Sequence, residues 1–231
     1  MLACEKLGIV AYKDWQEMQQ ESVRRRKENL QMDTLYCMEH VPVFTIGRTT
    51  RIHKDIKIQH GEDDTHLSGI PLVKSERGGG MMFHNPGQIV AYPIILLRGH
   101  IRNLRTLTWL MEEAIIQTLA TYKIDGFRRA EIQPGVWTEH GKIGFIGIAV
   151  RHQVVFHGCA FNIMNDLGPF KWIAPCGLEH GKITSITEST GTHPDLDECM
   201  DTFCMHFCTI YNQIETHSDA RQHTFGSIGT T

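Results

Sequence analysis

Three stretches of the chain place apolar residues three or four positions apart, which is the spacing of an amphipathic helix. They cover residues 11–30, 98–123 and 195–215. Asn103 stands where it could cap the second helix. The positions behind the first two predictions are Ala11, Trp15, Met18 and Val23, and then Leu104, Leu107, Met111, Ala114, Ile115 and Leu119.

Other stretches are rich in β-branched and aromatic residues and are bounded by turn residues, which predicts strands. The segments "TLYCMEH" (34–40) and "PVFTIG" (42–47) indicate two strands separated by a short turn, ending in Gly47-Arg48. The segments "GVWTEHGKIGFIGIAV" (135–150) and "VVFHGCAFNI" (154–163) are joined by polar turns and predict antiparallel hairpins.

Because the predicted strands follow one another in hairpins instead of alternating with helices, we expect an α+β fold. A single domain over residues 1–217 is the simplest division of the chain. Residues 218–231 form a polar, glycine-rich end that we expect to be a flexible tail.

The composition of the 231 residues is that of an ordinary globular protein, with 41% hydrophobic and 21% charged residues and a net charge of −3. No excess of basic residues points to nucleic acid or to a membrane surface, and no apolar run is long enough to span a bilayer. The first residues lack the pattern of a signal peptide or a transit peptide. The seven cysteines show no disulfide framework, which favours a reducing compartment.

The densest cluster of glycines lies in "RGGGMMFHNPGQIVAYPI", residues 77–94. Three consecutive glycines remove every Cβ from a short loop, so a ligand or another backbone segment can approach it closely. Arg77 and His84 would flank such a ligand; a tight connection between two strands is the other explanation. The loop is neither a Walker loop nor a dinucleotide-binding fingerprint.

Lys142 and Cys176 are the two residues best suited to chemistry. Lys142 opens an otherwise apolar strand between glycines, and a buried ammonium there would need a partner. Cys176 stands between Pro175 and Gly177, where the chain is expected to bend and present the thiol. A loop with a buried structural thiol has the same pattern, so the tripeptide alone does not establish a nucleophile.

Four segments, taken in order and spacing, resemble the lipoyl (octanoyl) transferases over residues 36–187. They are "MEHVPVFTIGR", "RGGGMMFHNPGQIVAYPI", "GVWTEHGKIGFIGIAVRHQVVFHGCAFNI" and "FKWIAPCGLEHGKITSI". The resemblance implies a fold similar to the catalytic domain of biotin and lipoate protein ligases. It implies transfer of an octanoyl or lipoyl group from acyl carrier protein to a lysine of a lipoyl domain, without a cofactor or a metal.

The resemblance also implies roles for residues and partners. Cys176 would be the nucleophile and Lys142 its proton partner, since a thioester donor can exchange with a thiolate and needs no ATP. The acceptors would be lipoyl domains of 2-oxoacid dehydrogenase E2 subunits and the glycine cleavage H protein, in a bacterial cytoplasm or a mitochondrial matrix. The residues expected to bind substrate are Arg77, Gly78, Gly79, Gly80, His84, Gly144, Ile146, Gly147, His157, Gly158 and Ala160.

The chain departs from the family pattern at three positions of one segment. Met82 stands where threonine is usual, Phe83 where tyrosine is usual and Asn85 where glycine is usual. These changes could reshape the acyl pocket, so a weakened acyl-binding protein remains an alternative. An ATP-dependent lipoate or biotin ligase is a second alternative and an amidotransferase a third; a ligase needs no nucleophile at position 176.

Several other polar clusters have a plainer explanation. Arg24-Arg25-Arg26-Lys27 is expected to be a solvated helix face, and the loop at 60–66 a solvated turn. The basic stretch at 48–57 could dock an acidic partner domain or be a solvated edge. His157 could be a hydrogen-bonded core histidine. The cysteines and histidines of the last helix have no tight C-x-x-C pair, so we expect no zinc site on Cys199, Cys204, Cys208, His193 and His206.

Overall fold

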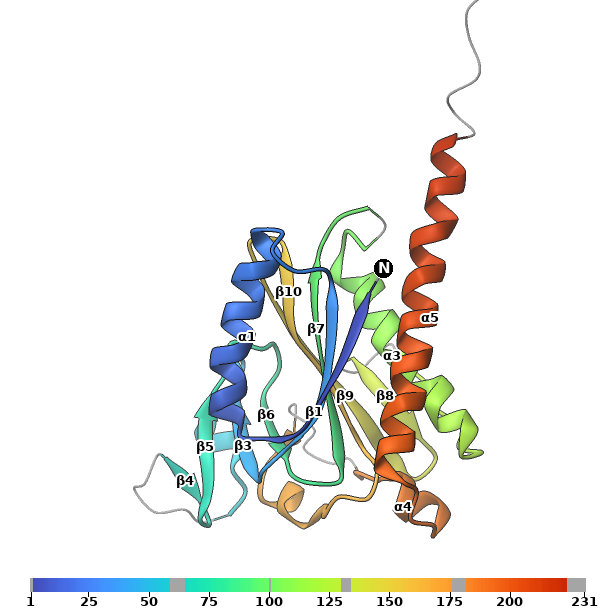
Figure 1. Ribbon diagram of the computed structural model, residues 1–231. Helices are drawn as coiled ribbons and strands as arrows, with labels where there is room; N and C mark the ends of the chain where they lie inside the picture. The colour runs from blue at the N-terminus through green and yellow to red at the C-terminus, as the bar shows by residue number, and fades with distance from the viewer. Residues whose placement is uncertain (1, 59–64, 100, 130–133, 176–181, 224–231) are drawn as a thin grey trace, which may run out of the picture.

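A computed structural model of the protein describes residues 2–58, 65–99, 101–129, 134–175 and 182–223, with side chains as far as residue 214 (Figure 1). Cys176 therefore lies outside the described residues, as do residues 60–64 of the predicted solvated turn.

A mixed six-stranded sheet forms the centre of the molecule, in the order β1-β2-β7-β10-β9-β8. Its neighbouring strands are antiparallel except for β1 and β2. The central strand β7 is buried along almost its whole length, which accounts for its continuous apolar sequence. The strands are β1 (Ala3–Val10), β2 (Thr34–His40), β7 (Gln88–Leu96), β8 (Gly135–Thr138), β9 (Gly141–Arg151) and β10 (Val154–Asn162).

Helices cover both faces of this sheet (Figure 1). Helix α1 (Tyr12–Lys27) packs on one face, over β7 and β10. Helices α3 (Leu104–Thr121) and α5 (Leu196–His223) pack together on the other face and bury the largest core cluster against it. Within the described part of the chain, no helix is both long and apolar enough to cross a membrane.

A smaller four-stranded sheet, in the order β4-β5-β3-β6, lies beside the lower part of α1 in Figure 1. Its aromatic core includes Phe44, Phe83 and Phe170, the last from the 3₁₀ turn η1 (Gly168–Trp172). The other elements of this region and of the chain's later part are β3 (Val43–Ile46), β4 (His66–Leu67), β5 (Ile70–Lys74), β6 (Met81–His84), α2 (Ile52–Asp55) and α4 (Ile186–Thr190).

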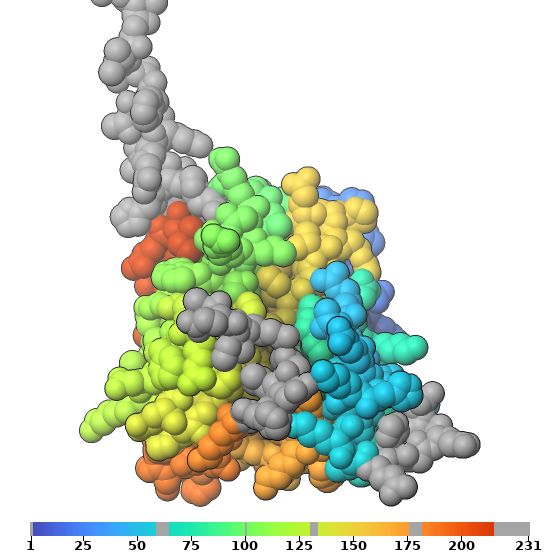
Figure 2. All heavy atoms as spheres, turned by 180° about the vertical axis from the view of Figure 1, so that it is seen from behind, coloured from blue at the N-terminus to red at the C-terminus, as the bar shows by residue number. Residues whose placement is uncertain are grey.

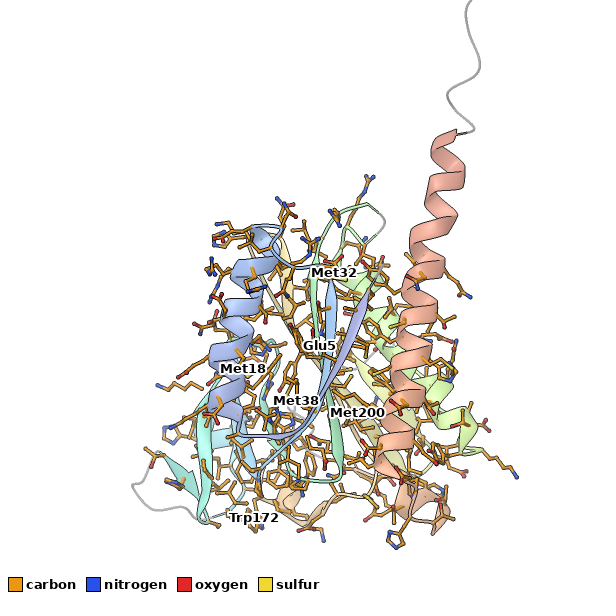
Figure 3. All side chains as sticks on the ribbon, in the orientation of Figure 1. Glu5, Met18, Met32, Met38, Trp172 and Met200 are labelled. Atoms are coloured by element: carbon orange, nitrogen blue, oxygen red, sulfur yellow. The ribbon has the colours of Figure 1, made fainter. Side chains whose placement is uncertain are left out.

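The predicted α+β fold and the three long helices are confirmed, with two corrections in α1. Met18, assigned to the apolar face and labelled on α1 in Figure 3, is 46% exposed. Arg26, assigned to a solvated face, is buried and pairs through its Nε with Asp33. The periodicity was wrong here because Gln19 and Ser22 occupy the buried face in place of apolar residues.

The strands at 34–40 and 42–47 do form, but they belong to different sheets. The hairpins built from β8, β9 and β10 are confirmed by their antiparallel registers. Strand β1 and the small strands β4 and β5 were not predicted. Helix α5 continues to His223, past the predicted start of the tail at residue 218.

Candidate active site

A small cavity of about 30 Å³ lies between the central sheet and the glycine-containing loop before β6. Such a volume holds one or two water molecules. Residues more than 140 positions apart in the sequence surround it: Tyr12, Arg77, Met82, His84, Val90, Tyr92, Phe145, Ile146, Gly147, His157, Gly158, Cys159 and Ala160. Seven of the residues predicted to bind substrate are in this set. The predicted residues Gly78, Gly79, Gly80 and Gly144 are not.

His157 is the polar side chain of this cavity that the surrounding protein leaves unpaired. Both ring nitrogens are buried without a hydrogen-bond partner among the described residues, unlike those of a hydrogen-bonded core histidine. Burial, followed by the charge of Arg77, lowers the pKa of His157 to about 3, so the ring is neutral at physiological pH.

The backbone explains how a strand residue comes to aim its ring into the cavity. The register pairs Val155 with Ile95 and Cys159 with Ala91, which places Pro93 opposite His157. Proline has no N–H to donate across the ladder. Here β10 departs from regular geometry, and His157 has a φ of +56°.

Two facing glycines provide the space beside His157. Gly158 and Gly147 are directly opposite each other on β10 and β9. A Cβ at Gly158 would lie 2.0 Å from the carbonyl oxygen of Ala91, and one at Gly147 would lie 3.1 Å from that of Gly78. The close approach of the β7 backbone at Ala91 to β10 therefore requires glycine at position 158.

His84 is held in one tautomer by a chain of buried amides. Gln88 donates from Nε2 to the Asn162 side chain at 2.9 Å, so its Oε1 accepts from His84 Nδ1 at 2.7 Å. His84 Nε2 lies 3.4 Å from the hydroxyl of Thr45. Burial, with a smaller contribution from His40, holds the pKa of His84 well below its usual range. The cavity thus contains two neutral imidazoles.

Arg77 fastens the glycine loop to the small sheet. Its guanidinium donates to the carbonyl oxygen and the hydroxyl of Thr45 at 2.8 and 2.7 Å, and to the carbonyl of Gly80 at 2.7 Å. Gly79 has a φ of +85°, a conformation that favours glycine. The predicted loop glycines therefore shape the wall through their backbones, with Arg77 as the residue that positions them.

Sequence reasoning did not find the aromatic side of the cavity. Tyr92 donates from its hydroxyl to His40 Nε2 at 2.7 Å, while His40 Nδ1 donates to the carbonyl of Val10 at 2.7 Å. Tyr12, the first residue of α1, donates to Ser75 at 2.8 Å. A tyrosine within the apolar run of β7 was the available signal, since a buried hydroxyl requires a partner.

Lys142 is fully buried, so its ammonium requires partners within the protein. Its Nζ lies over the rings of Trp137 and Phe145, 5.3 and 5.1 Å from their centroids, and donates weakly to the carbonyl of Pro134 at 3.4 Å. Phe145 also lines the small cavity, so one ring contacts both the ammonium and the cavity.

The described residues on either side of the Cys176 segment are anchored. Ala174 donates its N–H to the carbonyl of Asp55 at 2.7 Å. Where the description resumes, the carbonyl of Lys182 accepts from the N–H of Lys142 at 2.8 Å, and Thr184 donates to the Lys142 carbonyl at 3.0 Å. Pro175 and Lys182 both line a larger cavity of about 670 Å³, beside Lys57, Phe170 and Ile183 among others.

The three departures from the family pattern have different surroundings. Met82 lines the small cavity, whereas Phe83 packs against Phe44 and Phe170 in the core of the small sheet. Asn85 accepts from the Asn165 side chain at 3.0 Å and donates to the carbonyl of Asp166 at 3.0 Å. Only Met82 among them changes the wall of the cavity.

Comparisons with known proteins agree with this architecture. Residues 11–208 match the family described as the lipoyl protein ligase A/B catalytic domain. An octanoyltransferase of Desulfotalea psychrophila is 40% identical over 82% of this chain and 84% of its own length. One from Thermosynechococcus vestitus is 42% identical over 74% of each chain.

Solved structures support the same fold at low sequence identity. A putative lipoate protein ligase from T. acidophilum with bound lipoic acid has a TM-score of 0.71 at 16% identity, covering 91% of this chain and 86% of its own. A lipoate-protein ligase A bound with ATP has a TM-score of 0.65 at 14% identity, with 91% and 85% covered. The chain belongs to the lipoyl protein ligase A/B catalytic domain family, and its curated relatives include octanoyltransferases.

Proposed function

We propose that the protein transfers an octanoyl group from acyl carrier protein to a lysine of a lipoyl domain, through a thioester on Cys176. The observation that supports this most is the burial of Lys142 on the strand that binds the chain immediately after the Cys176 segment. The octanoyltransferases among the relatives give the reaction class.

In the first half-reaction the Cys176 thiolate attacks the carbonyl carbon of the acyl carrier protein thioester. A new C–S bond forms, the donor's C–S bond breaks, and the donor leaves as a thiol after taking up a proton from the Lys142 ammonium. An ammonium close to a thiol favours the thiolate, which is the role we assign to Lys142.

In the second half-reaction the ε-amine of the acceptor lysine attacks the acyl-enzyme. An amide bond forms and the bond to Cys176 breaks. The attacking amine loses one proton, which returns the active-site pair to its starting protonation state. The donor is already an activated ester, so this scheme consumes no nucleotide.

The small cavity is our candidate for the acyl-binding site. Its walls are largely apolar side chains and glycines, with two neutral histidines, and the guanidinium of Arg77 in the wall is occupied by Thr45 and the carbonyl of Gly80, which suits a hydrocarbon chain. At about 30 Å³ it cannot hold eight carbons as it stands. Entry of the chain therefore requires a side chain to move, and Met82 is the most flexible side chain in the wall. His157, with two unpaired ring nitrogens, would donate to the acyl carbonyl.

The exposed basic residues at 48–57 are our candidate docking surface for the donor or acceptor domain. Arg48, Arg51 and Lys54 are exposed around α2, which Figure 2 shows at the molecular surface in blue and cyan. Asp55, the acidic residue of the stretch, is buried and accepts from the Arg51 N–H at 2.9 Å. An acidic partner is expected here. If reversing Arg51 and Lys54 leaves the KM for acyl carrier protein unchanged, this assignment is wrong.

The decisive experiment is an intact-mass measurement. Purified protein is incubated with octanoyl-acyl carrier protein without ATP, and an apo lipoyl domain is then added. We expect a gain of one octanoyl group, absent in Cys176→Ala, followed by its discharge onto the domain. Cys199→Ala is a matched control, because this buried thiol contacts the Tyr122 hydroxyl, lies outside the small cavity and should leave acyl capture on Cys176 in place.

Two outcomes would replace the proposal. Acyl capture without discharge would indicate an acyl-binding member of the family. Modification of the domain only with free octanoate and ATP would indicate a ligase, the activity that the lipoate-protein ligase A fold neighbour suggests.

The free thiols of Cys37 and Cys204 lie close together but unbonded, which supports a reducing compartment such as a bacterial cytoplasm. Finding the protein in an oxidising compartment by cell fractionation would contradict this.

A further inference from the structure

Three cysteines far apart in the sequence bring their sulfur atoms together on one face of the six-stranded sheet, the face opposite helix α1. The Sγ atoms of Cys4, Cys37 and Cys204 all lie within 4.8 Å of one another, and those of Cys37 and Cys204 are 3.4 Å apart. These three residues are called the thiol cluster below. Cys208 lies one helical turn after Cys204 on α5, outside the set of sulfurs that are all within 4.8 Å of one another.

The parallel pairing of β1 with β2 produces this convergence. Lys6 is opposite Cys37 in the register, so Cys4, two residues earlier on β1, projects from the same face of the sheet. Helix α5 covers that face, and its Asp201 binds Lys6 with an Nζ–Oδ1 distance of 2.6 Å. Cys204 and Cys208 follow Asp201 by three and seven residues, so they lie on the same face of α5 as Asp201 and above the two strands. Figure 3 labels Glu5 and Met38, the neighbours of Cys4 and Cys37, and Met200, one turn before Cys204.

We propose that the thiol cluster binds a thiophilic divalent cation of the zinc class, with Cys4, Cys37 and Cys204 as ligands and Cys208, one helical turn further along α5, moving in as the fourth. Tetrahedral zinc with Zn–S bonds of about 2.3 Å separates its sulfurs by about 3.8 Å, which lies between the two limits seen in the cluster. Carboxylate-preferring cations such as magnesium would find no oxygen ligands in this set.

A metal explains the cluster better than a redox disulfide does. A disulfide would join two sulfurs at about 2.05 Å and leave the others without a role. Cys4 is exposed and supplies a route of entry, while Cys37 and Cys204 are buried and would hold the ion away from water. A bound ion would tie the first strand to the last helix and so stabilise the fold, without taking part in acyl transfer.

Cobalt(II) is a suitable probe, because thiolate coordination gives charge-transfer bands and a tetrahedral site gives intense visible bands. The titration uses reduced full-length Cys176→Ala, so that the proposed nucleophile cannot contribute a ligand. We expect one equivalent to bind, to be displaced by zinc, and to raise the unfolding temperature. Cys4→Ser and Cys204→Ser should each weaken the affinity more than about tenfold.

Cys199→Ala is the matched control. It lies on α5 five residues before Cys204, but its thiol donates to the Tyr122 hydroxyl at 2.8 Å and lies outside the thiol cluster. It should bind cobalt like its parent. Cys4 is exposed, so Cys4→Ser tests the site without disturbing the core even if Cys204→Ser fails to fold.

The absence of thiolate bands in the Cys176→Ala protein would overturn the proposal, and so would bands that survive in Cys4→Ser with unchanged affinity. A disulfide within the cluster, found by peptide mapping after purification under air and reversible by a thiol reductant, would also overturn it. None of these results bears on acyl capture by Cys176, so the proposal and the proposed function can fail separately.

Discussion

Shortening Met82 should change the acyl chain length that the enzyme prefers. Met82 lies on β6, contributes to the wall of the small cavity, is 3% exposed and belongs to the core cluster of the small sheet. Met82→Ala removes three heavy atoms from a cavity that now holds only one or two waters. The proposed octanoyl chain would have more room, and longer chains would fit.

The size of the effect follows from the burial of methylene groups. Each buried CH₂ contributes about 0.8 kcal/mol, so the two additional methylenes of a decanoyl chain contribute about 1.6 kcal/mol. At about 1.4 kcal/mol per factor of ten, the ratio of kcat/KM for decanoyl over octanoyl donors should rise roughly 15-fold in Met82→Ala. The unliganded variant should lose about 2–5 kcal/mol of stability through the enlarged cavity.

Met81→Ala is the control that separates specificity from general destabilisation. Met81 is the preceding residue on β6, is fully buried in the same core cluster, and does not line the cavity. The assay measures acyl transfer from octanoyl- and decanoyl-acyl carrier protein to an apo lipoyl domain. If both variants change the ratio equally, or if Met82→Ala leaves it unchanged, the cavity is not the acyl-binding site.

Three further predictions concern stability. Asp33 accepts from buried Arg26, from the Leu96 N–H and from Tyr211, so Asp33→Asn should cost about 3–5 kcal/mol in urea unfolding. Glu21→Gln, which removes an exposed ion pair, should leave the free energy of unfolding almost unchanged. Burial lowers the pKa of His40 from 6.5 to about 4, so the unfolded chain binds more protons than the folded protein between these pH values. The free energy of unfolding therefore falls as the pH drops through this range, and His40 alone should lower it by about 2 kcal/mol at pH 5 relative to neutral pH. His40→Asn should flatten that slope in unfolding curves measured from pH 7 to 5, and an unchanged slope would show that another group is responsible. Gly158→Ala should prevent soluble folding, because its Cβ would clash with a backbone oxygen at 2.0 Å, and a Gly158→Ala protein with wild-type melting temperature would refute the packing described here.

The parts of the fold that depend on residues close together in the sequence could be predicted from it. Helical periodicity predicted α3, and Asn103 caps it by accepting from the Thr106 N–H at 2.9 Å. The turns between β8, β9 and β10 predicted their antiparallel pairing. Strand β1 was missed because its half-exposed pattern is weak and its partner β2 lies beyond a whole helix.

The sequence predicted which residues belong to the candidate site, but not how their side chains are arranged. The resemblance to octanoyltransferases pointed to His84 and His157, yet the sequence did not reveal that one is held by Gln88 while the other has unpaired nitrogens. Tyr92 and Tyr12 were missed because aromatic residues in apolar runs usually belong to a core. Their position in a cavity wall depends on how two sheets and a helix meet.

The sequence by itself determined the helices, the hairpins and the residue types available for chemistry, because these depend on local spacing and on side-chain properties. Only the tertiary structure decided which of them meet. Pro93 lies opposite His157 because of the register in which β7 pairs with β10, and β10 departs from regular geometry there. Cys4, Cys37 and Cys204 converge because a parallel strand pair lies under the last helix, and long-range pairing of this kind leaves no periodic signal in the chain.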